Sequence, residues 1–298
     1  RTRTFTVSTG KEYWEDESEA AADTAHHIDS EHHELKVTPD FISVSEMLAK
    51  HYGQPYADHS SVLTYYISRE TRKFVKVALT GDGGDELFAG YNGYLKTSLY
   101  DILGIIPFHL RSTIGEILSG LQFKSARRDM RDAIQSAFPL PQKGENITSL
   151  FHRKWREEVF EDDFKKTISE SIDSEIEKFT CYYNEASSKH PLDKWLEADQ
   201  RLYLCDDILC KLDIASMSVS LECRSPFLDH RLAEYVNMIS SSAKIAGGRS
   251  KAILRDLALR RLPQRTSRLQ KKGFSMPLGK WMRKDLKGVM RSLIFDRK

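Results

Sequence analysis

The chain has 298 residues, a formal net charge of +2 and a hydrophobic content of 40%, which describes an ordinary globular protein of one large or two smaller domains. No apolar run approaches the ~20 residues that a membrane-spanning helix needs, and the first residues lack a signal-peptide pattern, so we expect a cytoplasmic protein. The four cysteines form no C-x-x-C pair, which argues against a zinc site or a disulfide framework.

Strand and helix signals alternate through the first hundred residues. Residues 4–7 predict a short strand, and apolar residues alternate with polar ones from His33 to Val37 as in a second strand. Strands that alternate with helices of this length indicate βαβ units and a parallel sheet. Helices are predicted at about 17–27, 44–52 and 60–73, and a third strand at 75–79.

Helical patterns dominate the rest of the chain, and prolines mark the breaks between them. Residues 168–183, for example, carry apolar side chains at helical spacing. We therefore place a boundary near residue 100, with an α/β part at 1–100 and a mostly helical part at 101–298.

A turn rich in glycine and acids follows the third strand, within VKVALTGDGGDELFAGYNGY (residues 75–94). Its glycines permit a tight turn, and its last two acids open a helix. Open α/β sheets bind ligands beyond the carboxyl ends of their strands, where this turn falls. Because acids repel bare phosphate, we expect Mg²⁺ held by Asp82, Asp85 or Glu86 beside a nucleotide. The alternative is a turn whose acids only complement the helix dipole.

A second candidate is Lys251, in the segment GGRSKAILRDLALRRLP (residues 247–263). This segment predicts a helix capped by Ser250, with Lys251 at its first position and an apolar stripe that includes Leu254 and Leu257. A cation there opposes the helix dipole, so local stability does not explain it. Its ammonium suits a phosphate or a developing oxyanion, and the alternative is a solvated surface lysine.

Basic residues are concentrated at the C-terminal end, where residues 244–298 hold seventeen Lys or Arg against three acids. This charge could face a nucleotide, a nucleic acid or the acidic N-terminal part of the same chain, or could simply be solvated. Within it, Lys271 and Lys272 beside Gly273 suit a phosphate-contacting flap, and the alternative is a turn between helices.

The segment from Tyr203 to Val236 predicts two helices joined by a short connection. Its ionisable residues would need internal partners if the segment faces the core, which favours an ion-paired scaffold over direct substrate contact. The residues concerned are Asp206, Asp207, Asp213, Glu222 and Arg224.

Taken together, these segments resemble the synthetase domain of the asparagine synthetase family over most of the chain. The motifs that carry the resemblance occur in the family's order: TGDGGDELFAGY, SLECRSPFLDH, SKAILR and QKKGFSMPL, preceded by EHHELKVTP and QPYADHSSVLTYYISR. The resemblance implies an adenine-nucleotide-hydrolase-like α/β fold. It also implies that ATP activates a carboxylate, usually that of aspartate, as an acyl-adenylate before ammonia attacks.

The resemblance assigns roles to single residues. It implies that Asp85 binds Mg²⁺, that Asp82 lies beside the substrate and nucleophile, and that Lys251 stabilises the developing charge. The nucleotide-binding residues that it implies, together with the basic loop, are Val7 through its backbone, Thr80, Gly81, Gly83 and Lys272.

Two parts of the family pattern do not occur in these residues: a Ser-Gly-Gly-x-Asp-Ser pyrophosphate loop and a glutaminase domain with its cysteine. We therefore expect a sheet without its first strand, in a chain that is part of a longer protein whose glutaminase domain supplies ammonia. A homodimer is compatible with the resemblance. A non-catalytic remnant that binds a nucleotide or a partner is the alternative function, and nucleic-acid binding is not favoured.

Overall fold

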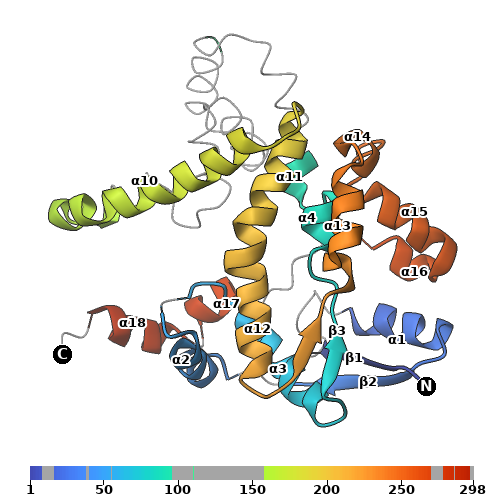
Figure 1. The fold of residues 1–298 in the computed structure, drawn as a ribbon. Coiled ribbons are helices and arrows are strands. Elements are labelled where there is room, and N and C mark those ends of the chain that lie inside the picture. Colours follow the sequence, from blue (N-terminus) through green and yellow to red (C-terminus); the bar gives the residue numbers. More distant parts are fainter. Residues whose placement is uncertain are drawn as a thin grey trace. The chain divides into compact units, whose positions relative to one another are not determined.

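The structure is a computed structural model that describes residues 1–8, 17–37, 40–54, 56–95, 110, 158–269, 278–284 and 286–295. Figure 1 shows the helices and strands in these ranges as a ribbon. The chain divides into two compact units. The boundary expected near residue 100 lies outside the described residues. Unit 1 comprises Arg1–Thr80, Ile208–Pro226 and Asp256–Lys298, and unit 2 comprises Gly81–Asp207 and Phe227–Arg255.

Unit 1 contains two small parallel sheets. β1 (Arg3–Ser8) pairs with β2 (Glu31–Lys36), and α1 (Ser18–His27) forms the crossover between them. β3 (Val77–Leu79) pairs with β4 (Glu222–Arg224). The predicted strands and their parallel direction are confirmed, but β3 is shorter than expected. Among the described residues the strands form two separate sheets rather than one, because β1 and β3 share no backbone hydrogen bonds.

The main core of unit 1 lies between three helices. α2 (Phe41–Tyr52) and α3 (Ser60–Arg72) confirm the predicted helices, and both pack against α12 (Cys210–Met217). Asp40 begins α2, since its side chain accepts a hydrogen bond from the Ser43 N–H at 3.1 Å. Lys211 of α12 forms an ion pair of 2.8 Å with Asp58, directly before α3. The buried core residues are Val37, Val44, Leu48, Tyr52, Val62, Leu63, Tyr66, Ala215 and Trp281.

Part of the basic C-terminal charge is neutralised within unit 1. Arg265 of α16 (Gln264–Ser267) forms ion pairs with Glu19 and Asp23 of α1, at 3.0 and 3.3 Å. The hydroxyl oxygens of Thr24 and Thr266 lie 2.7 Å apart at the same contact. One of the alternatives for the basic segment, pairing with the acidic N-terminal part of the chain, therefore holds at this position.

Unit 2 is helical in its described part. α10 (Asp162–Glu185) confirms the helix predicted at 168–183 and packs on α11 (Pro191–Arg201), and Phe179 and Trp195 stack with ring centroids 4.7 Å apart. A second cluster joins Leu87 and Phe88 of α4 (Gly84–Phe88) to Val236 of α13 (His230–Asn237). The other elements in the described ranges are the π-helix η1 (Leu204–Leu209), η2 (Pro226–Leu228), α14 (Ser241–Lys244), α15 (Ala252–Arg261), α17 (Leu278–Arg283) and α18 (Lys287–Phe295).

None of the helices in the described ranges is long and apolar enough to cross a membrane. The apolar stripe expected on α15 is only partly right. Ala252 is buried and Leu254 packs against the second cluster of unit 2, but Leu257 is 53% exposed.

Leu196, which is buried, and Leu257, which is exposed, give a matched test of the packing of α11 and α15. Leu196 on α11 is 1% exposed, so Leu196→Ala should lower the free energy of unfolding by about 2–5 kcal/mol through lost burial and a cavity. Leu257→Ala should change it by no more than about 0.5 kcal/mol. Urea unfolding of both variants checks this, and equal losses would contradict the burial of α11.

Candidate active site

The glycine-rich turn begins where β3 and β4 end. Thr80 donates its backbone N–H to the Arg224 carbonyl oxygen at 2.9 Å, and its hydroxyl oxygen lies 2.9 Å from that of Ser225. These two hydroxyls stand at the carboxyl ends of parallel strands, where open α/β sheets bind ligands. The expected placing of Thr80 after a strand is confirmed, and its role in a nucleotide pocket stays a prediction.

Gly83 shows why the turn requires glycine. Its φ of +85° is in the left-handed region, and a Cβ atom built on it would lie 2.3 Å from a methyl carbon of Leu228. The residue caps α4, because its carbonyl oxygen accepts the first helical hydrogen bond from Leu87 at 3.0 Å. Both the backbone conformation and the packing of unit 2 therefore exclude a side chain at this position.

The central contact of the site is an ion pair between Asp85 and Lys251. The Lys251 Nζ atom lies 3.0 Å from Asp85 Oδ1, and the two side chains are 25% and 17% exposed. Asp85 is in the first turn of α4 and Lys251 directly precedes α15, so residues far apart in the sequence meet here. The arrangement leaves both groups partly accessible to a ligand while screening them from most of the solvent.

Lys251 differs from its expected place at the first helical position. Its φ is +51°, and its carbonyl oxygen accepts the first helical bond from the Arg255 N–H at 2.8 Å, so Lys251 itself caps α15. Its N–H donates to the carbonyl oxygen of Ala89, which also has a positive φ of +56°. Left-handed backbone at two non-glycine residues is strained, and such strain is concentrated at functional sites.

The ion pair occupies the space that a side chain at position 90 would fill. A Cβ atom at this residue would lie 1.9 Å from Asp85 Oδ1 and 2.2 Å from the Cε carbon of Lys251. Its N–H also donates to the Asp85 carbonyl oxygen at 2.8 Å. The glycine after Ala89 is therefore needed for close approach, a requirement that sequence reasoning did not identify.

Glu86, the neighbour of Asp85, is buried in the protein. The residue is 1% exposed, and the Tyr91 hydroxyl donates a hydrogen bond to its Oε1 atom. Burial raises the pKa of Glu86, which the hydrogen bond from Tyr91 partly offsets. Of the three acids considered for Mg²⁺, Asp82 and Asp85 remain, and Glu86 is occupied by its own partner.

A second buried acid, Asp199 on α11, was not identified from the sequence. The Tyr94 hydroxyl donates to its Oδ2 atom at 2.5 Å, and the Trp195 side chain is also hydrogen-bonded to it. Burial raises the pKa of Asp199 to about 7; the hydrogen bond from Tyr94 lowers it, and the charge of Glu86 raises it further. Nothing in its sequence neighbourhood distinguishes this aspartate from a surface acid.

The acids that looked buried in the segment from Tyr203 to Val236 are mostly exposed. Asp206, Asp213 and Glu222 are at exposed positions, and Glu222 pairs at 2.7 Å with Arg224, which is also exposed. The expected ion pairing therefore holds for Glu222 and Arg224, but the expected burial is wrong for these residues. The buried acidic and basic side chains in the described part of unit 2 are instead Glu86, Asp199 and Lys244.

The other residues predicted to form the site belong to different parts of the chain. Val7 is in β1 of unit 1 and pairs in register with Leu35. Asp82 is half-buried in the turn of unit 2, next to the exposed Gly81. Lys272 lies outside the described residues. Within unit 2 the structure thus brings Lys251 to Asp85, beside the turn that carries Gly81, Asp82 and Gly83.

The role of Gly90 can be tested with Gly93, three residues further along the chain, as the control. Gly90→Ala should destabilise the protein by about 1–3 kcal/mol, because its methyl group overlaps the ion pair. A Cβ atom on Gly93 would meet nothing within 4 Å, so Gly93→Ala should be close to neutral. Thermal unfolding measures both, and a neutral Gly90→Ala would contradict the close approach.

The buried state of Asp199 predicts a pH dependence of stability. Between its ordinary pKa of 3.8 and about 7 the folded protein binds more protons than the unfolded chain, so this group's contribution to stability is complete below pH 3.8 and lost above about pH 7. Asp199→Asn cannot ionise and still accepts the Tyr94 hydroxyl. Its Tm relative to wild type should therefore rise from about pH 4.5 to about pH 8. A constant difference would contradict the assignment, and Asp213→Asn, at an exposed position, is the control.

Comparison with known proteins identifies the family of the chain. The family model for asparagine synthase matches residues 1–298. Asparagine synthetase [glutamine-hydrolyzing] 1 of Bacillus subtilis is 27% identical over 288 residues, which are 93% of this chain and 43% of the relative. A putative asparagine synthetase of Mycobacterium tuberculosis is 28% identical over 287 residues, 94% of this chain and 42% of the relative. The chain spans less than half the length of these relatives, and it belongs to the asparagine synthase family.

Proposed function

We propose that this chain contributes the synthetase site of an ATP-dependent, amide-forming ligase. The observation that carries the proposal is the Asp85–Lys251 ion pair, held beside a glycine-rich turn by two left-handed residues and a glycine without room for a side chain. The membership of the chain in the asparagine synthase family supports the same chemistry.

In the proposed reaction, an oxygen of the substrate carboxylate attacks the α-phosphorus of ATP and pyrophosphate leaves. Ammonia then attacks the acyl carbon, AMP leaves with the bonding electrons of the acyl–oxygen bond, and a proton is released from nitrogen. Negative charge develops in both steps, and the ammonium of Lys251 can stabilise it because the group is only 25% exposed. Asp82 is proposed to lie beside the substrate and nucleophile.

The residues of the turn fit a Mg²⁺ ion, provided that the nucleotide supplies other ligands. No group of three or more His, Cys, Asp or Glu side chains in the described ranges could hold a metal alone. Mg²⁺ is commonly bound by one or two carboxylates together with phosphate oxygens and water. Asp85 would hold the ion, with Asp82 as the second carboxylate of the turn, and the ion would neutralise charge on the phosphates.

The finer assignments follow from the family and belong to the same proposal. Aspartate is the proposed carboxylate, and a glutaminase domain of the longer protein is the proposed source of ammonia. Val7, Thr80, Gly81, Gly83 and Lys272 are the proposed nucleotide contacts. A cytoplasmic location and a homodimer stay predictions.

Substitution of Lys251 tests the mechanism in the full-length protein. Lys251→Ala should lower the rate of substrate-dependent exchange between ATP and pyrophosphate by about 10²–10³-fold, because one charge-stabilising group is lost. Lys166→Ala, on a side chain of α10 that is 80% exposed, should leave the rate unchanged. Near-normal exchange in Lys251→Ala, with its fold confirmed by circular dichroism, would remove Lys251 from the mechanism.

The alternative of a non-catalytic remnant is tested separately. Titration calorimetry of the full-length protein with Mg-ATP, with and without aspartate, distinguishes the two. Nucleotide binding without any exchange would support the remnant.

A further inference from the structure

α4 is too short to hold its own position. The helix has five residues, and the residues on both sides, Gly83 and Ala89, are left-handed. Helices of this length are not stable through their internal hydrogen bonds. The direction of Asp85, on the first turn of α4, therefore depends on what packs against the helix from the rest of unit 2.

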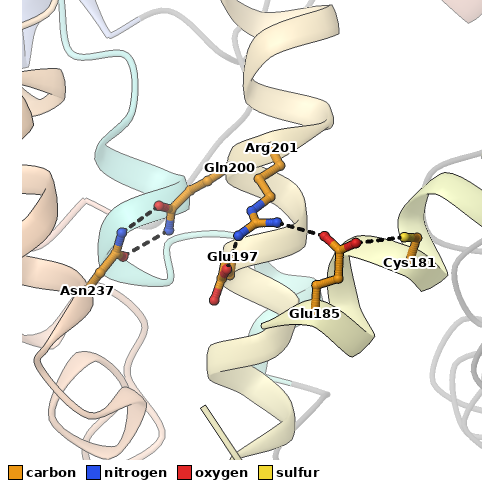
Figure 2. A network of polar contacts seen from close by, with 6 residues as sticks. All are labelled: Cys181, Glu185, Glu197, Gln200, Arg201 and Asn237. Atoms are coloured by element: carbon orange, nitrogen blue, oxygen red, sulfur yellow. Dashed lines mark hydrogen bonds and ion pairs between the residues drawn. The ribbon is translucent and has the colours of Figure 1, made fainter. Parts of the chain in front are cut away.

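Gln200, near the end of α11, provides one such contact. Its amide nitrogen donates to the backbone carbonyl oxygen of Glu86 at 3.4 Å and to the side-chain oxygen of Asn237 at 3.1 Å. In return the Asn237 amide donates to the Gln200 side-chain oxygen at 2.9 Å, as Figure 2 shows. Because the Glu86 carbonyl can only accept, the contact fixes which end of the Gln200 amide faces α4.

Asp199, which precedes Gln200 on α11, is linked to the Glu86 side chain through two tyrosines. Asp199 binds the Tyr94 hydroxyl, and the Tyr94 N–H donates to the Tyr91 carbonyl oxygen at 3.0 Å. Tyr91 then donates its hydroxyl to the carboxylate of Glu86. Gln200 thus holds the backbone of Glu86, and Asp199 holds its side chain through the two tyrosines. Glu86 is the next residue after Asp85 in the chain, so both contacts also constrain Asp85.

α11 is itself anchored on α10. Arg201 pairs with Glu185 of α10 at 3.1 Å and with Glu197 of its own helix at 2.6 Å (Figure 2). Trp195 and Leu196 are buried in the core that α10 and α11 share. Because exposed ion pairs contribute little, the buried Trp195 and Leu196 rather than Arg201 fix α11 as the support for the short helix α4.

We propose that Asp199 and Gln200 are positioning residues, which hold α4 through Glu86 and thereby keep Asp85 in contact with Lys251. The inference rests on the proposed function for its catalytic consequence. Its structural content concerns only the contact between the two charged groups, and this contact can be probed without enzyme turnover.

Trace acetylation of lysines, read by mass spectrometry, reports on this contact. Asp85→Asn removes the charged partner of Lys251 and should raise its acetylation by about two- to fivefold, the range expected for an ion pair of partly exposed groups. Gln200→Glu keeps the shape of the side chain but loses the donor to Glu86, and Tyr94→Phe loses the hydroxyl that Asp199 binds. Both should raise Lys251 acetylation toward the level of Asp85→Asn.

Arg201→Gln is the matched control. It breaks the pairs with Glu185 and Glu197 in the same polar network without removing a contact to α4, so Lys251 acetylation should stay at the wild-type level. The exposed Lys166 serves as the internal standard in every sample. Wild-type labelling in both Gln200→Glu and Tyr94→Phe would overturn the proposal, as would no response to Asp85→Asn.

Exchange kinetics in the full-length protein separate this proposal from the proposed function. If wild type exchanges pyrophosphate, Gln200→Glu should lower kcat/KM for ATP in the exchange, because the misplaced α4 carries Asp85, the proposed ligand of Mg²⁺. Absence of exchange in wild type would refute the proposed function, and the acetylation result would still decide the positioning role. Unchanged exchange together with unchanged acetylation would refute positioning alone.

Discussion

The ion pair between Asp85 and Lys251 is the contact on which the candidate site depends. It brings the first turn of a five-residue helix to Lys251, which caps another helix with a left-handed backbone. Ala89 and Lys251 are both left-handed and joined by a backbone hydrogen bond, and the absent side chain of Gly90 provides the space. A strained backbone of this kind persists only when its surroundings leave no relaxed alternative.

The surroundings are the helices of unit 2. Leu87 and Phe88 hold one side of α4 through an apolar cluster, while Glu86 is held by hydrogen bonds. Two adjacent acids on one short helix therefore have different roles. Asp85 is half-buried and faces a cation, whereas Glu86 is buried and has a raised pKa. The two residues are both acids, so it is their different burial and their different partners that make Asp85 a candidate ligand and Glu86 a structural support of α4.

The charge of the chain is also explained in part by local partners. Arg265 pairs with two acids of α1, so some of the basic C-terminal charge is compensated within unit 1. Lys251 pairs with Asp85 in unit 2. A basic segment in a sequence thus need not mark a surface for an anionic macromolecule, because acids distant in the sequence can neutralise it. At the candidate site this compensation leaves a cation and a carboxylate together, partly exposed, as the proposed ligase chemistry requires.

Local pattern by itself was sufficient for the strands near residues 4 and 33, for the helices of the first hundred residues, and for the glycine-rich turn before α4. Strand alternation, helical spacing and a cluster of glycines at a turn are properties of neighbouring residues, so the sequence states them directly. The family motifs also placed Asp85 and Lys251 in one predicted site.

Tertiary structure alone decided that Lys251 caps its helix in a left-handed conformation and that Gly90 must lack a side chain. It also decided that Asp199 is buried while Asp206 and Asp213 are exposed. Each of these depends on which distant segment packs against the residue, and a sequence read along the chain does not contain that information.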